Sequence, residues 1–124
     1  MSGLIPSAIA AGSVLIAAYY GTNKALGAHP FWDTQVALIG VPIGLILAFA
    51  LRALKWRWST RLLTFLVLLT IAGTAAHQGR LEFAASYAEN KLAGQLWYFG
   101  WIASMSFATA TLAAIMTPGQ NRQR

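Results

Sequence analysis

Four long apolar segments, separated by short polar stretches, dominate the pattern of this chain. They cover approximately residues 4–20, 35–51, 62–77 and 96–116. A helix needs about 20 mostly apolar residues to cross a hydrocarbon core of about 30 Å. Because the apolar residues form continuous runs instead of recurring along one helical face, the pattern predicts membrane-spanning helices. We therefore predict an all-α, polytopic membrane protein with four transmembrane helices in a single domain over residues 1–124.

Residues 80–93 have a different pattern, in which apolar and polar side chains fall on opposite faces of a helix. The apolar positions are Leu81, Ala84, Ala85, Ala88 and Leu92. This spacing predicts a short amphipathic helix that lies in the interface between the third and fourth spans, with Gly79 ending the third span. The alternative is a third span that continues through these residues as one long helix and projects out of the membrane.

Composition strengthens the membrane assignment. The chain is 57% hydrophobic and only 10% charged, whereas soluble domains contain about 25% charged residues. Its formal net charge of +6 does not indicate nucleic-acid binding, because excess Lys and Arg in membrane proteins is explained by orientation and by attraction to anionic lipids. The absence of cysteine excludes disulfides and thiolate chemistry.

A basic cluster separates the second and third apolar segments. It consists of Arg52, Lys55, Arg57 and Arg61, with Trp56 and Trp58 between them. A charged side chain at the centre of a spanning helix costs about 2.5–3.5 kcal/mol, so we expect these cations at the lipid headgroups, where they orient the protein. A docking surface for a cytoplasmic partner is the alternative.

The distribution of cations predicts the orientation in the membrane. With four spans, both termini lie on the side of the basic cluster. That side carries Arg52, Lys55, Arg57, Arg61, Arg122 and Arg124, and the opposite side carries Lys24, Arg80 and Lys91. The positive-inside rule then places both termini in the cytoplasm, and we expect a bacterial inner (plasma) membrane.

Two sets of small residues recur every four positions and predict close helix contacts. They are Gly40, Gly44 and Ala48 in the second span, and Gly100, Ser104 and Ala108 in the fourth. The glycines of the second span can pack against a span of the same chain or against another subunit. Pro42 between them also allows a functional hinge.

Few side chains offer chemistry near neutral pH. They are Asp33, Glu82, Glu89, His29 and His77, and none lies near the middle of a predicted span. Proton-coupled transporters usually hold an ionisable residue at membrane depth, so this distribution disfavours one. The spacing matches no catalytic or metal-binding motif, and we predict no enzyme, catalytic residue, cofactor or metal site. A metal or haem site built from His29 and His77, with Asp33 and Glu82 nearby in sequence, is the alternative. His77 is the better candidate, because it ends the third span, where an axial ligand of haem or a pigment could lie.

We therefore expect a non-enzymatic accessory or structural subunit of a larger inner-membrane complex, of secretion, respiratory or photosynthetic type, or a self-associating oligomer. Its expected partners are membrane lipids, some of them bound, and other membrane subunits or further copies of itself. A small channel, holin-like pore or transporter is the alternative. A haem- or pigment-binding subunit that uses His77 is a further one.

Overall fold

The computed structural model describes residues 4–26, 33–87 and 89–116, and the regular structure in these ranges is entirely helical. The helices are α1 (Leu4–Tyr19), α2 (Thr22–Leu26), α3 (Asp33–Ala53), α4 (Trp58–Ala85) and α5 (Lys91–Ile115). The expected all-α class is confirmed. Within the described ranges, α3, α4 and α5 are long and apolar enough to cross a membrane. The apolar α1 has 16 residues, about 24 Å, so three helices meet this criterion instead of the expected four.

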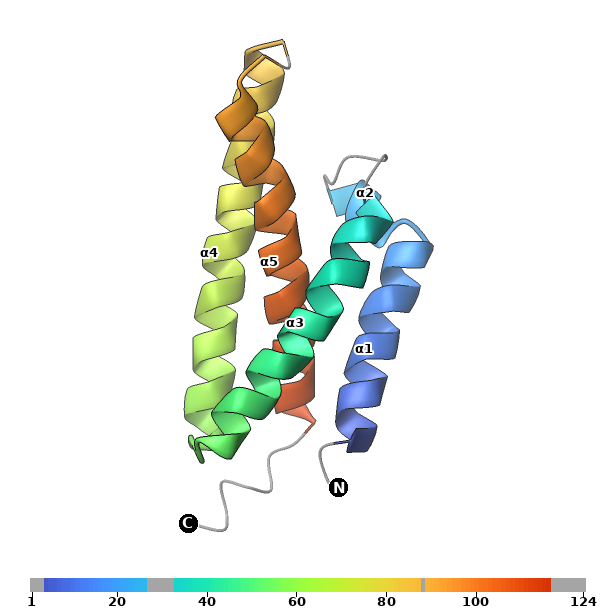
Figure 1. Cartoon of the computed structure of the whole chain (residues 1–124), viewed down its shortest axis with the longest axis vertical. Helices are drawn as coiled ribbons and strands as arrows, with labels where there is room; N and C mark the ends of the chain where they lie inside the picture. Colours follow the sequence, from blue (N-terminus) through green and yellow to red (C-terminus); the bar gives the residue numbers. More distant parts are fainter. Residues whose placement is uncertain (1–3, 27–32, 88, 117–124) are drawn as a thin grey trace.

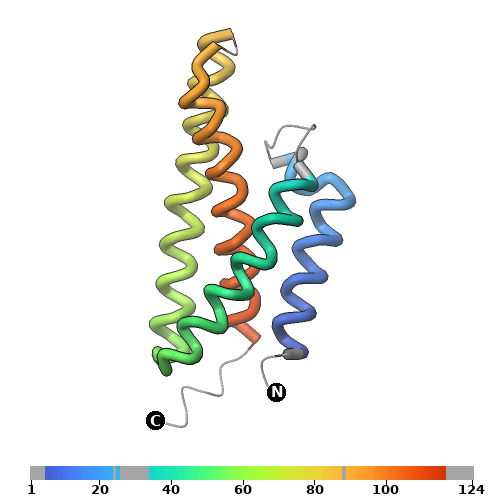
Figure 2. Tube along the Cα trace, viewed as in Figure 1, coloured from blue at the N-terminus to red at the C-terminus, as the bar shows by residue number. Residues whose placement is uncertain are grey.

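Helix α5 lies at the centre of the bundle (Figures 1 and 2). It pairs with α4 in a long antiparallel hairpin, α3 crosses it obliquely, and α1 lies beside α3 on the side away from α4. The buried share of the most apolar stretch is 56% in α5, compared with 28% in α3 and 22% in α4. Helices α3 and α4 therefore supply much of the outer surface, and α5 supplies the contacts that hold the bundle together.

Residues 54–57, here called the basic turn, connect α3 and α4 tightly and carry Lys55 and Arg57 of the basic cluster, whereas Arg52 lies in α3 and Arg61 in α4. Lys55 takes a left-handed conformation with φ 62°, and its N–H donates to the carbonyl of Arg52 at 3.0 Å. The N–H of Trp56 donates to the carbonyl of Leu51 at 3.2 Å, which completes the pair of hydrogen bonds that often ends a helix. The start of α1, the end of α5 and this turn share one end of the bundle (Figure 1).

The separate amphipathic helix expected over residues 80–93 does not form. Helix α4 continues without a break to Ala85, so the first part of this stretch extends the third helix, and α5 begins at Lys91, within its last part. Gly79 does not end the span. It is buried in the α4–α5 contact, where an added Cβ would lie 2.6 Å from the backbone nitrogen of Trp97. Helix α4 continues past Gly79 because the absence of a side chain there allows the α5 backbone to pack directly on it.

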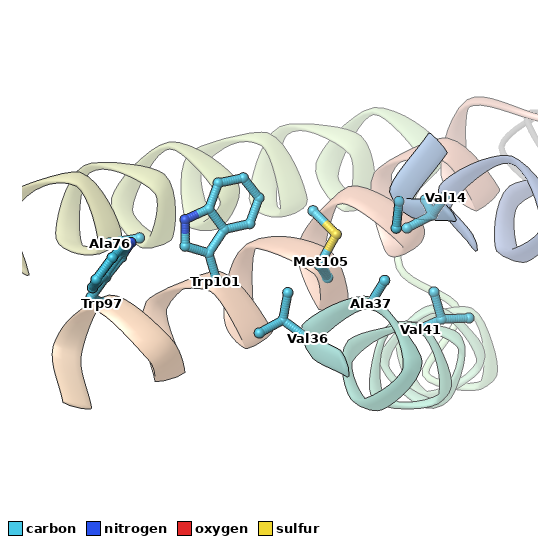
Figure 3. Packing of buried hydrophobic residues seen from close by; sticks show 9 residues of the cluster. Val14, Val36, Ala37, Val41, Ala76, Trp97, Trp101 and Met105 are labelled. Carbon is cyan, nitrogen blue, oxygen red and sulfur yellow. The ribbon is translucent and has the colours of Figure 1, made fainter. Parts of the chain in front are cut away.

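The main hydrophobic core joins α1, α3, α4 and α5 around α5 (Figure 3). It contains Val14, Ala18, Val36, Ala37, Val41, Ala76, Trp97, Trp101 and Met105. A smaller cluster of Phe65, Ala110 and Ala114 lies nearer the basic turn. Large apolar side chains also point outward from α1, α3 and α4, among them Ile16, Ile46 and Leu63. An apolar exterior over an interior that contains many small residues is compatible with helices that cross a membrane.

Candidate functional site

The two glycines of α3 face α5 within the same chain. A Cβ added to Gly40 would lie 2.6 Å from Cβ of Met105, and one added to Gly44 would overlap the carbonyl oxygen of Ser106. Ala48, one turn further along α3, packs on the smaller core cluster. The sequence left open whether these glycines pack against the same chain or against another subunit. The contacts described here are made with another helix of the same chain.

The small residues of α5 have different neighbours. Gly100 faces α4, where an added Cβ would lie 2.9 Å from Cα of Ala76. Ser104 is buried and donates its hydroxyl to the carbonyl of Gly100 at 2.7 Å. Ala108 is half-buried and, with Ser104, borders a groove between α4 and α5. This face of α5 therefore provides a close helix contact at Gly100 and the wall of a groove further along.

The buried hydroxyl groups of α5 are satisfied inside their own helix. Ser104, Ser106, Thr109 and Thr111 each donate to the carbonyl four residues earlier, at 2.6–2.9 Å. Such bonds let a hydroxyl lie in an apolar bundle without a further partner. These side chains consequently act as small packing residues.

The four cations of the basic cluster occupy different environments. Lys55 and Arg57 are exposed, Arg52 is half-buried, and Arg61 is only 2% exposed. Arg61 lies with Phe65 on the buried face of α4. It also borders, with Arg52, a small cavity of about 10 Å³. In the sequence, Arg61 lies four residues before Phe65, a spacing that places both on one face of a helix, and this was the signal for its burial. Because other cations lie close to it in sequence, Arg61 was grouped with the exposed charges instead.

Trp58 fastens the basic turn to the end of α5. Its indole N–H donates to the carbonyl of Ala114 at 2.5 Å, across 56 positions of sequence. The sequence indicated only that this tryptophan lies near the membrane boundary. The structure adds that it closes the α4–α5 hairpin at the end opposite its turn.

A groove of about 360 Å³ runs along the seam between α4 and α5. Helix α4 contributes Leu69, Gly73, Ala76, His77 and Arg80, and α5 contributes Trp97, Trp101, Ser104, Met105 and Ala108. Figure 3 shows Trp101 and Met105 standing on the same side of α5. The groove brings three of the predicted residues together, namely His77, Ser104 and Ala108. His29, the other histidine, lies outside the described residues.

Arg80 is the one Lys, Arg, Asp or Glu residue among those of the described ranges that line the groove. Arg80 and His77 are exposed at its end nearest the α4–α5 turn, and among the described residues no carboxylate lines it. In the same part of the chain, no group of three or more His, Asp or Glu residues is arranged to hold a metal ion. The arrangement suits recognition of an anionic group beside an apolar body.

No protein family, curated protein or solved structure matches this chain. Its function is therefore inferred from the helices, the groove and the placement of charge.

Proposed function

We propose that this protein is a non-enzymatic, multi-pass membrane protein that serves as a structural subunit of a larger assembly in a bacterial inner membrane. The observation that carries the proposal is the apolar outer surface of α3 and α4. Ile46 on α3 and Leu63 on α4 are 67% and 64% exposed, and both helices are long enough to span a bilayer. Soluble monomers rarely expose apolar patches larger than a few hundred Å², so lipid or a partner covers these faces.

Membrane thickness agrees with the positions of the cations on α4. Arg61 and Arg80 are separated along the helix by about 28 Å, close to the thickness of the hydrocarbon core. The residues between them are uncharged. In this arrangement the last turns of α4 and the first turn of α5 extend beyond the hydrocarbon, and α1 forms a short fourth span beside α3.

The orientation proposed from the sequence has the basic turn in the cytoplasm, together with the start of α1 and the end of α5. The shared location of these three segments supports placing them on one side of the membrane, and the positive-inside rule makes that side the cytoplasm (Figure 1). Arg122 and Arg124, which add to the charge of this side, lie outside the described residues. Because the chain has no cysteine, single cysteines report position cleanly. In intact cells an impermeant maleimide should label Glu89→Cys but not Ser59→Cys, and the reverse pattern would refute this orientation.

Packing inside the bundle favours a structural role over a pore. Gly44 and Gly100 bring α3 and α4 into backbone contact with α5. The hydroxyls of Ser104 and Thr109 bond to their own helix, so they are not presented to a water-filled path. These features are those of a rigid scaffold.

Extraction of the tagged chain in a mild detergent, followed by native mass measurement, tests the proposal. We expect either other membrane subunits at fixed stoichiometry or a defined homo-oligomer. A homogeneous monomer without protein partners would count against a structural subunit.

A further inference from the structure

The groove between α4 and α5 has a charged end and an apolar length. Arg80 and His77 lie at the charged end, and Leu69 and Ala108 line it further along. Its volume of about 360 Å³ is that of a small-molecule site, for which about 300–1,000 Å³ is typical. Ser104 adds little polarity, because its hydroxyl already donates to the carbonyl of Gly100.

Depth in the membrane gives these two parts different surroundings. If α4 spans the bilayer as proposed above, Arg80 lies at the hydrocarbon boundary. Leu69 then lies about 16 Å deeper along the helix. Trp97 lines the groove near the charged end, at the level that interfacial indole rings prefer. A ligand that fits this site has its anionic group at the boundary and its apolar part within the membrane.

Gly73 gives the groove free space beside the α4 backbone. Gly40, Gly44, Gly79 and Gly100 are each needed for a close helix contact, whereas a Cβ added to Gly73 would meet nothing within 4 Å. Glycine inside a helix costs about 0.8–1 kcal/mol relative to alanine. Gly12 on α1 is equally open, but it does not line the groove. Gly73 lines the groove, so its missing side chain leaves room for an occupant to lie against the α4 backbone.

We propose that this groove binds one anionic glycerophospholipid, with its phosphate at Arg80 and an acyl chain along Gly73 and Leu69. Guanidinium groups bind phosphate oxygens through paired, charge-assisted hydrogen bonds, and basic pockets between spanning helices are suited to anionic headgroups. His77 lies one turn before Arg80 on α4 and borders the headgroup position. The inference rests on the proposed membrane location, but it does not depend on a protein partner.

Native mass spectrometry of the full chain in mild detergent tests the site with two added lipids. Phosphatidylglycerol and phosphatidylcholine of identical acyl chains differ in headgroup charge only. The wild type should retain one phosphatidylglycerol in clear preference to phosphatidylcholine. Arg80→Gln should weaken phosphatidylglycerol binding about fivefold to tenfold. The matched control Lys91→Gln removes an exposed cation on the same side of the membrane that does not line the groove, and it should bind as the wild type does.

Filling the groove tests the position of the acyl chain. Gly73→Leu should abolish retention of both lipids, whereas Gly12→Leu should leave retention unchanged, because a Cβ on Gly12 also meets nothing within 4 Å but Gly12 lies on α1. If Gly73→Leu does not give folded protein by circular dichroism, Ala108→Leu narrows the groove from the opposite helix and should have the same effect.

Three results would overturn the proposal. They are equal binding of the two lipids by the wild type, equal losses in Arg80→Gln and Lys91→Gln, and unchanged retention when Gly73 is replaced by leucine. A bound chromophore whose absorption band disappears in His77→Ala would show that a pigment occupies the groove instead. A chain that purifies without protein partners but keeps its anionic lipid would refute the structural-subunit proposal and leave the lipid site intact.

Discussion

Replacing Gly44 by alanine tests the closest approach between α3 and α5. The new methyl carbon would overlap the carbonyl oxygen of Ser106 and lie 2.9 Å from Cβ of Thr109. A backbone carbonyl in a helix cannot rotate away, so the two helices have to separate. We therefore expect the variant to fold with a weaker α3–α5 contact.

The magnitude follows from two opposing terms. Overpacking a well-packed contact costs about 1–3 kcal/mol. The gain in helix propensity on replacing glycine by alanine offsets about 0.8–1 kcal/mol of this cost. Gly12→Ala isolates the second term, because its methyl group meets nothing within 4 Å. The difference in stability between Gly44→Ala and Gly12→Ala should therefore be about 1–3 kcal/mol, with Gly44→Ala the less stable.

Reversible unfolding in mixed micelles of a mild detergent and dodecyl sulfate provides the assay, with tryptophan fluorescence as the signal. A difference of about 1.4 kcal/mol appears as a tenfold change in the unfolding equilibrium constant. If Gly44→Ala is as stable as Gly12→Ala, the backbone contact between α3 and α5 is absent and the reasoning fails.

The same unfolding assay checks three further predictions. Trp58→Phe removes the indole hydrogen bond to Ala114 and should cost about 1 kcal/mol, so an unchanged midpoint would show that the hairpin is not closed by this bond. Asn90→Ala removes the side-chain cap that accepts from the N–H of Ala93 at 3.0 Å and should also cost about 1 kcal/mol, with a stability equal to that of the wild type as the contrary result. Tyr87 is 92% exposed and has a left-handed backbone conformation with φ 58°, which glycine adopts without strain. Tyr87→Gly should therefore stabilise the protein by about 1 kcal/mol. A loss of stability would show that the tyrosine ring makes stabilising contacts, contrary to its exposure in this structure.

Helix class and approximate position could be predicted because both depend on local pattern. Continuous apolar runs predicted the bounds of α1 and α3 to within two residues, whereas α5 begins five residues before the expected start of the fourth span. The end of α4 could not be predicted in the same way, because a glycine between an apolar and an amphipathic stretch indicates either a helix end or a close contact. At Gly79 the contact with Trp97 decides between the two, and it forms only when α5 is in place.

The groove was beyond sequence reasoning for a related reason. His77 and Ala108 could each be placed on a helical face, but their meeting depends on the register between α4 and α5. That register is set where Gly100 packs against Ala76, a contact between two helices distant in sequence. Arg61 shows the opposite difficulty, since its position among charged neighbours concealed its place on the buried face of α4.

Photo-crosslinking in living cells tests most directly whether the protein is a structural subunit. A photoreactive amino acid would be placed, one position at a time, at outward-facing Ile16 on α1, Ile46 on α3 and Leu63 on α4. We expect at least one position to give a discrete adduct with another membrane protein or with a second copy of the chain. Lipid adducts alone from all three positions would contradict the proposal.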